Sequence, residues 1–283
     1  MLTLVALLAF AGNSLLCRLA LRHTAIDAAS FTLIRLVAGA LCLWLIARWR
    51  DGPRAPQQAL AGNWPSAAAL FVYAAAFSFA YASLTAGTGA LLLFGAVQAS
   101  MIGWGLCKGE RLRGLQVAGW AVALAGLVGL VLPGWAAPPW QGSGLMVAAG
   151  MAWAVYTVRG KVGPGGSNHG DPLQVTAGNF ARAVLPAALC SALLWGGAAA
   201  DAAGVACAVA SGALASGVGY AVWYTVLPRL RVTTAATLQL AVPVIAAAGG
   251  IVWLGEALTW RLMLAAPAVL GGIALVVVGG KKR

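Results

Sequence analysis

Residues 87–107 read GTGALLLFGAVQASMIGWGLC and contain no charged side chain. A helix that crosses the hydrocarbon core of a bilayer needs about 20 predominantly apolar residues, and this stretch has that length. Nine further stretches of the 283-residue chain have a similar character. The sequence therefore predicts an all-α integral membrane protein with ten transmembrane helices.

Charged residues, prolines and glycines mark the ends of the predicted helices. The ten segments are 2–20, 28–47, 65–85, 87–107, 114–132, 142–156, 173–195, 205–227, 232–254 and 258–279. The sixth is short, and the seventh is interrupted by Asn179 and Arg182. No long polar segment separates the helices, which argues against an additional extramembrane domain.

The composition points to lipid as the solvent of most of the chain. Charged residues make up 8% of it and hydrophobic residues 61%, whereas a soluble domain is roughly 25% charged. The net charge of +12 comes from short basic clusters between apolar segments. This pattern is typical of loops that face an anionic leaflet and disfavours nucleic acid as a partner.

The basic residues predict the orientation. With a cytoplasmic N-terminus, thirteen Lys and Arg residues fall in inner loops or at the C-terminus and three, Arg18, Arg22 and Arg261, in outer loops. Cytoplasmic loops of membrane proteins carry an excess of Lys and Arg. Both termini are therefore predicted to be cytoplasmic.

The two halves of the sequence match each other. The pairs at an offset of 146 or 147 residues include Gly109-Glu110 with Gly255-Glu256, Thr88 with Thr234, Leu92 with Leu238, Gly126 with Gly272, Arg35 with Arg182, Tyr73 with Tyr220 and Phe77 with Tyr224. We expect two five-helix repeats, over 1–134 and 141–283. Because five is odd, the second repeat would be inverted in the membrane. Inverted repeats are typical of alternating-access carriers, whose substrate site lies near the bilayer midplane.

The sequence resembles the drug/metabolite transporter superfamily in its ten-helix EamA-type branch. The residues that carry the resemblance are AGTGALLLFGAVQ at 86–98, GERL at 109–112, ATLQLAVPV at 236–244 and LGEAL at 254–258. One departure is that Val97 stands where the second half has Pro243. The resemblance implies export of amino acids or related metabolites, as in the YddG-type exporters, and a bacterial-type inner membrane.

The sequence lacks the residues that several kinds of chemistry require. No Gly-rich loop ending in Gly-Lys-Ser/Thr is present, which argues against ATP hydrolysis by this chain, and no ATPase partner is evident. No Asp, Glu or His falls at predicted membrane depth, although proton relays and intramembrane proteases need such groups. We expect no enzyme activity, no cofactor and no metal site.

The candidate substrate-binding residues are aromatic or polar side chains at predicted membrane depth. They are Asn13, Tyr73, Phe77, Tyr81, Gln98, Trp153, Tyr156, Tyr220, Tyr224 and Gln239. Residues 73, 77 and 81 share one helix face. The aromatic residues could equally pack against other helices, and the amides could equally join helices.

Two basic residues lie well inside predicted helices. Arg35 and Arg182 could neutralise a substrate carboxylate or could reach a membrane interface and bond to helix-end carbonyls. The acids Glu110 and Glu256 are expected to cap helices or to pair with Arg113 and Arg261.

Three small or helix-breaking residues are candidates for packing or hinge positions. Gly212 and Gly217 allow close helix packing, with a flexing point as the alternative, and Pro243 leaves a backbone carbonyl free.

The sequence is compatible with three functions. The first is a secondary transporter of small organic solutes, most simply amino acids including aromatic ones, in contact with membrane lipid. The second is a membrane assembly or binding subunit that transports nothing, and the third is a broad multidrug exporter. The second predicts no solvent-accessible central cavity.

Overall fold

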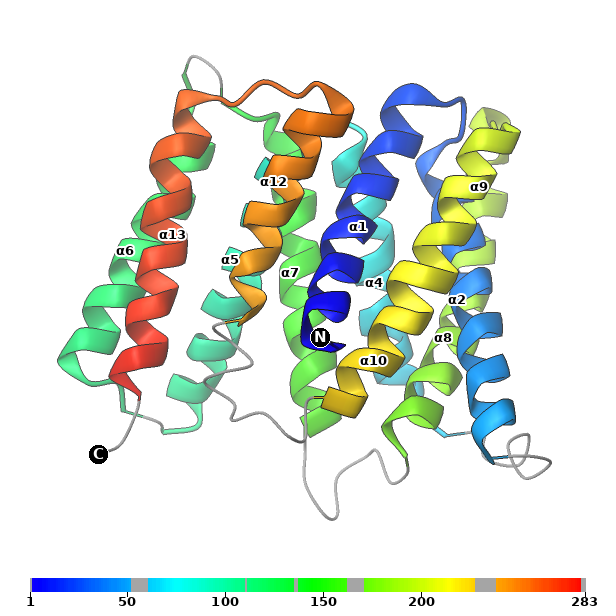
Figure 1. Ribbon diagram of the computed structural model, residues 1–283, viewed down its shortest axis with the longest axis horizontal. Helices are drawn as coiled ribbons and strands as arrows, with labels where there is room; N and C mark the ends of the chain where they lie inside the picture. Colours follow the sequence, from blue (N-terminus) through cyan, green and yellow to red (C-terminus); the bar gives the residue numbers. More distant parts are fainter. Residues whose placement is uncertain are drawn as a thin grey trace.

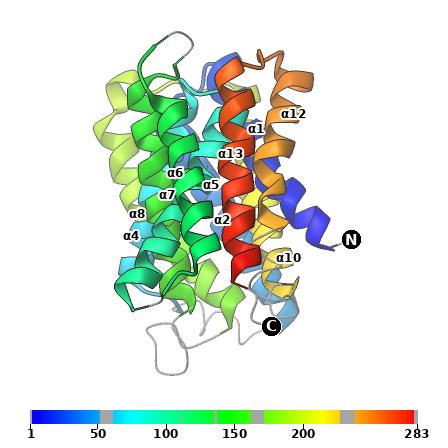
Figure 2. The ribbon, with the colours of Figure 1, turned by 90° about the vertical axis from the view of Figure 1, so that its left-hand side faces the viewer.

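The computed structural model describes residues 2–51, 61–109, 111–134, 137–161, 171–226 and 238–280. Throughout these residues the regular structure is helical, and no strand occurs. The principal helices are α1 (Leu2–His23), α2 (Ala28–Asp51), α4 (Trp64–Tyr81), α5 (Ala86–Cys107), α6 (Gly114–Val131), α7 (Trp140–Lys161), α8 (Pro172–Leu193), α9 (Ala202–Ala210), α10 (Gly219–Val226), α12 (Ala241–Leu254) and α13 (Trp260–Gly279). They run roughly parallel or antiparallel to one direction (Figure 1 and Figure 2).

The helices confirm an all-helical membrane fold. Seven spans in the described residues are long and apolar enough to cross a bilayer, among them Ala202–Trp223, which joins α9 to α10. Helices α7 and α8 have 22 residues each but a less apolar composition, and α12 has 14 residues. The predicted count of ten spans therefore stays a prediction. The predicted sixth segment was too short, since α7 extends to Lys161.

The span between α9 and α10 contains a π-helix, η3 (Ser211–Val218). Its glycines are positions of close approach. A Cβ added to Gly212 would lie 2.1 Å from the Arg35 carbonyl oxygen of α2, and one added to Gly217 would lie 2.8 Å from Cys42 Sγ. A β-carbon at either position would force the two helices apart, so both glycines are packing positions in this structure.

The repeated Gly-Glu pairs follow two helix ends. Gly109 has φ 87° after α5, and Gly255 has φ 62° after α12. A residue in the left-handed region at the end of a helix is usually glycine, because a β-carbon is penalised there. This backbone requirement explains why glycine recurs in both halves.

The bundle has a centre and two flanks. Helices α6 and α13 pack together on one flank, whereas α2 lies with α8 and α9 on the other (Figure 1). Between them, α4 and α5 contact α7, and α1 contacts α10 and α12. The α6–α13 contact is close at Gly119 and Gly272, where a β-carbon on either residue would lie within 2.6 Å of the other's carbonyl oxygen.

Candidate functional site

A cluster of aromatic rings fills the centre of the bundle. Tyr73, Phe77 and Tyr81 stack along one face of α4, with ring centroids 5.5 Å apart between the first two and 4.7 Å between the last two. All three side chains are buried. The four-residue spacing predicted this shared face, and the structure directs the face inward.

Trp153 of α7 joins the rings of the two halves. Its ring centroid lies 4.8 Å from that of Tyr73 on α4 and 5.4 Å from that of Tyr220 on α10, with 15° between the planes of the latter pair. Tyr156 stacks on Trp153 at 5.5 Å. Because Tyr73 and Tyr220 are counterparts in the predicted repeat, the indole is placed between two equivalent side chains.

Amide and hydroxyl groups border the rings. Asn13 Nδ2 of α1 donates a long hydrogen bond of 3.5 Å to the Tyr73 hydroxyl, and Ser211 Oγ of η3 donates to Asn13 Oδ1 at 2.6 Å. Asn179 of α8 donates to the Tyr156 hydroxyl, also at 3.5 Å. The cluster is thus an apolar wall with a few polar groups, which is the usual composition of a site for a small organic ligand.

One guanidinium lies against this wall. Arg35 of α2 is 1% exposed, and its Cζ is 5.4 Å from the centre of the Tyr73 ring and 4.9 Å from that of Phe77. Its Nε and Nη1 atoms are buried without a hydrogen-bond partner among the described residues. The cluster therefore contains one positive charge.

Arg182 differs from its repeat counterpart. Its Nη1 donates to the carbonyl oxygens of Ala61 at 2.8 Å and Gly178 at 3.0 Å, and its side chain is half-buried. Arg182 therefore bonds to backbone carbonyls, one in the segment before α4 and one within α8.

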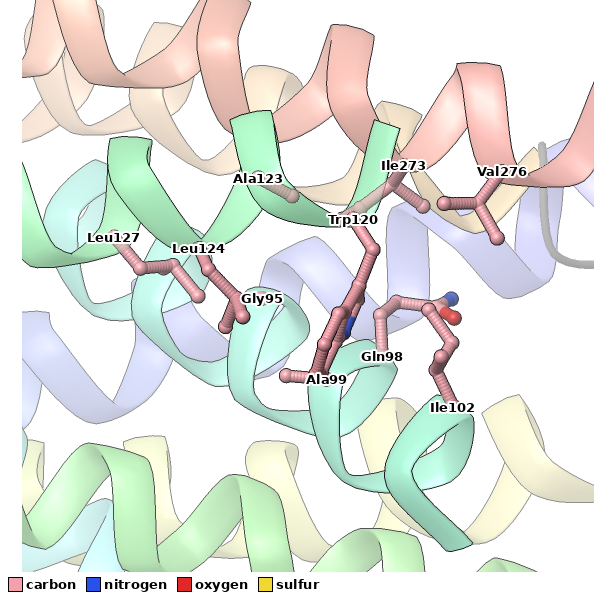
Figure 3. Close-up of a pocket in the computed structure, with 10 residues that line it drawn as sticks. All are labelled: Gly95, Gln98, Ala99, Ile102, Trp120, Ala123, Leu124, Leu127, Ile273 and Val276. Carbon is pink, nitrogen blue, oxygen red and sulfur yellow. The ribbon is translucent and has the colours of Figure 1, made fainter. Parts of the chain in front are cut away.

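Gln98 lies apart from the aromatic cluster. It lines a small cavity of about 10 Å³ between α5, α6 and α13, and Trp120 lines the same cavity (Figure 3). A cavity of roughly this size is at the lower limit for one water molecule. Trp120 Nε1 is buried and has no hydrogen-bond partner in the described part of the chain.

The remaining candidates lie in or near the last third of the chain. Gln239 is half-buried just before α12, and Pro243 is buried within that helix. Tyr224 belongs to α10, but its side chain lies outside the described residues, as does Glu110. The substrate-site roles of Gln239 and Tyr224, the packing or hinge role of Pro243 and the capping or pairing role of Glu110 stay predictions.

Some residues of the cluster were not singled out by the sequence reasoning. Phe10 of α1 and Phe180 of α8 each place a ring centroid 5.9 Å from that of Tyr220, and Ser211 bonds to Asn13. A phenylalanine or a serine in an apolar helix carries no local signal. Asn179 was noted only as an interruption of its helix, although an amide at membrane depth is a signal for an interior contact.

Glu256 was expected to cap a helix or to pair with Arg261; it bonds to the first residue of α5, and its ion-pair partner is Arg18. Glu256 Oε1 accepts from Arg18 Nε at 2.9 Å, and Oε2 accepts from the Ala86 backbone at 2.8 Å. Arg18, predicted in an outer loop, is a buried residue of α1 that also donates to the Tyr81 carbonyl oxygen at 2.9 Å. Arg261 instead donates to backbone carbonyls beyond α6. Partners this distant in sequence leave no local pattern.

A metal site finds no support in the parts of the chain that the structure describes. No three His, Cys, Asp or Glu side chains gather there as they would around an ion. The cluster offers rings, hydroxyls, amides and one guanidinium, which suit non-covalent binding of a small organic molecule.

Comparison with known proteins agrees with this architecture. Residues 140–278 match the EamA-like transporter family. An uncharacterized protein of Pseudomonas aeruginosa is 55% identical over 276 residues, which cover 98% of this chain and 93% of that protein. A protein of Streptantibioticus cattleyicolor named "Probable terminal-alkyne amino-acid exporter" is 27% identical over 79% of this chain and 74% of its own length.

A solved crystal structure shares the fold. It covers 98% of this chain and 97% of its own, with a TM-score of 0.69 and 22% sequence identity. The chain belongs to the EamA-like transporter family, within the drug/metabolite transporter superfamily. It is a multi-pass membrane transporter and not an enzyme.

Proposed function

We propose that this transporter is a secondary carrier that exports small organic solutes, amino acids including aromatic ones, by alternating access. The observation that carries the proposal is the aromatic cluster around Trp153, which receives side chains from both halves of the chain. The relative from Streptantibioticus cattleyicolor, named as an amino-acid exporter, supports the solute class.

The packing of the helices supports two inverted five-helix repeats, 1–134 and 141–283. In the proposed repeats, α1, α2, α4, α5 and α6 correspond to α7, α8, the span from α9 to α10, α12 and α13. Exchanging each helix with its counterpart reproduces the contacts. The contact of α4 with α7 corresponds to that of α1 with α10, the contact of α5 with α7 to that of α1 with α12, and the contact of α2 with η3 to that of α4 with α8. The pairs α2–α8, α5–α12 and α6–α13 map onto themselves. Such a two-fold relation is what inverted-repeat carriers use to open alternately toward each side.

The basic residues support cytoplasmic termini in a bacterial-type inner membrane. Arg50 and Arg159 lie toward one end of the helices, where α2 and α7 finish, and they belong to the predicted inner set. The start of α1 and the end of α13 lie in the same half of the bundle (Figure 1). This arrangement is compatible with an even number of spans, ten in the present proposal.

The substrate site that we propose consists of Asn13, Tyr73, Phe77, Tyr81, Trp153, Tyr156 and Tyr220. These residues are mutually linked by ring contacts and hydrogen bonds. Transport would need the ring contacts to separate so that a solute can enter. We place Gln98 and Gln239 on the walls of the path, outside this cluster.

Counterflow into proteoliposomes tests the carrier function. Liposomes with purified protein are loaded with an unlabelled amino acid, and uptake of the labelled one is followed for a panel of the twenty amino acids. The proposal predicts transient accumulation of at least one solute above protein-free liposomes. A bundle that serves only as an assembly subunit would give no accumulation with any of them.

A further inference from the structure

We infer that Arg35 is the anion-binding residue of this transporter. The transported solutes would carry a carboxylate that pairs with the Arg35 guanidinium. The inference rests on the proposed carrier function and narrows its substrate class to organic acids, zwitterionic amino acids among them. It also assigns different roles to the two arginines that the repeat makes equivalent.

The first argument is the burial of a guanidinium that keeps two donor atoms without a hydrogen-bond partner. Arg35 is 1% exposed, with Nε and Nη1 both buried and without hydrogen-bond partners among the described residues. It lies seven residues after the start of α2, about 10 Å along the helix axis. The guanidinium therefore lies well inside the helix, away from its end.

The second argument is that the four carboxylates whose side chains the structure describes have other partners. Glu256 pairs with Arg18 and Asp171 with Arg50. Asp27 and Asp201 accept backbone N–H groups at the starts of α2 and α9. None of these four groups forms an ion pair with Arg35. A charge buried without a counter-ion is costly, and in membrane proteins such residues typically mark a substrate pathway.

The third argument is the position of the guanidinium at the edge of the aromatic cluster. Arg35 Cζ lies 5.4 Å from the centre of the Tyr73 ring and 4.9 Å from that of the Phe77 ring. The face of an aromatic ring attracts a guanidinium, but a carboxylate attracts it more strongly. Tyr73 also contacts Trp153. A solute whose carboxylate reaches Arg35 would therefore place its remaining atoms against the rings.

The fourth argument is the contrast with Arg182. Two carbonyl oxygens already accept from Arg182 Nη1, so this residue ties α8 to the segment before α4. The two halves consequently offer one anion-binding arginine and one structural arginine. The solute is expected to bind in a single orientation, with its carboxylate toward α2.

Competition in the counterflow assay tests the inference. Phenylalanine, leucine and threonine are each compared with their own carboxamide, which keeps the side chain and amine but lacks the carboxylate. For every amino acid that the wild-type protein transports, we expect the amide to compete at least about tenfold more weakly, the loss expected from one charge-assisted hydrogen bond. Equal competition by acid and amide would overturn the carboxylate site while leaving the carrier function intact.

Variants separate a binding role from a structural one. Arg35→Gln is expected to lose transport and the preference for acid over amide, whereas its thermal midpoint stays equal or rises because an unpaired buried charge is removed. Arg35→Lys, which keeps the charge, is expected to retain part of the acid preference. Arg22→Gln, at an exposed position of α1, is the matched charge control and should behave as wild type.

The outcomes are distinguishable. A wild-type protein without counterflow of any solute overturns the carrier function and the carboxylate site with it. An Arg35→Gln protein that transports with an unchanged acid preference overturns the carboxylate site alone. Arg35→Gln with a strongly lowered thermal midpoint would show that the guanidinium stabilises the fold and would also overturn the assignment.

Discussion

At the scale of single residues, Trp153 connects the rings of the central cluster, with contacts to Tyr73 of α4 and Tyr220 of α10. The four-residue spacing of Tyr73, Phe77 and Tyr81 defined a helix face, because helical periodicity is local. The contacts of Trp153 with Tyr73 and Tyr220 depend on which helices adjoin, which spacing along the chain cannot reveal. For the same reason Arg18 was not predicted as the ion-pair partner of Glu256.

Arg35 and Arg182 show most clearly that the sequence does not reveal the partners of a side chain. The predicted repeat makes them equivalent, so both had the same two possible roles. The structure separates them, because the carbonyl oxygens of Ala61 and Gly178 accept from Arg182, whereas Nε and Nη1 of Arg35 are buried without a hydrogen-bond partner among the described residues. Backbone carbonyls carry no sequence signal, and this distinction could not be predicted.

The carboxylate of Asp27 gives a pH-dependent prediction at this scale. It accepts from the backbone of Ala29, Ser30 and Ala199 at 2.9–3.0 Å. Burial raises the pKa of Asp27, but the hydrogen bonds from Ser30, Ala199 and Ala29 outweigh it and hold the pKa below its ordinary value. The ionised group thus stabilises the folded protein above its unfolded-state pKa, and this stability is lost as the pH falls through the lowered folded-state pKa.

Asp27→Asn should therefore lower the thermal midpoint at neutral pH. Thermal unfolding of both proteins in detergent between pH 3 and 8 measures the difference, which should be constant down to about pH 5 and shrink below about pH 4. A difference that stays the same to pH 3 would contradict the assigned role of the carboxylate.

At the scale of elements, glycines set the distance between helices. Gly212 of η3 approaches the Arg35 carbonyl oxygen so closely that a β-carbon would lie 2.1 Å away. The sequence offered packing and flexing as alternatives for this residue, and the contact favours packing. The π-helical turn itself was not predicted, because its wider hydrogen-bond spacing has no composition of its own.

Gly212→Ala should destabilise the protein by roughly 1–3 kcal/mol, the usual cost of overpacking, seen as a lower thermal midpoint. Gly144→Ala in α7 is the matched control, because a β-carbon there meets nothing within 4 Å. The control should unfold at the wild-type midpoint or slightly above it. Equal midpoints for the two variants would contradict the close contact of η3 with α2.

The ion pair of Arg18 and Glu256 joins three elements of the bundle. It connects α1 to the loop between α12 and α13, and Glu256 also accepts from the first residue of α5. Both side chains are about one-tenth exposed, so removing one partner leaves a poorly solvated charge. Breaking such a pair costs roughly 3–5 kcal/mol when it is fully buried.

We therefore expect Arg18→Gln to lower the thermal midpoint, and Glu256→Gln to do the same. The double variant should be less destabilised than the sum of the single ones, because neither charge is then left alone. Thermal unfolding of all four proteins gives the coupling energy. Strictly additive effects would show that the pair contributes nothing.

At the scale of the whole molecule, composition and helix length were sufficient to predict an all-helical membrane protein. Lipid imposes this outcome, since every backbone polar group must be satisfied within the span. Helices α7 and α8 are long enough to cross a bilayer but less apolar than the seven candidate spans. They contribute several residues to the central cluster, such as Trp153, Tyr156 and Asn179. Their polarity weakens the hydropathy signal because those side chains face protein and not lipid.

The proposed two-fold relation between the helix contacts is the basis of the proposed mechanism. A central cluster shared by two halves can be reached from opposite sides if the halves rock against each other. In a rigid assembly subunit the same rings would form a permanent core. The two accounts differ in whether water ever reaches Tyr73, which is 5% exposed in this structure.

Thiol accessibility at position 73 tests the account most directly. The five native cysteines, Cys17, Cys42, Cys107, Cys190 and Cys207, are first replaced, and Tyr73→Cys is introduced. A membrane-impermeant thiol reagent is then applied to vesicles of either orientation, with and without a transported amino acid. The account predicts labelling from both sides and protection by the amino acid, whereas labelling from neither side would contradict it.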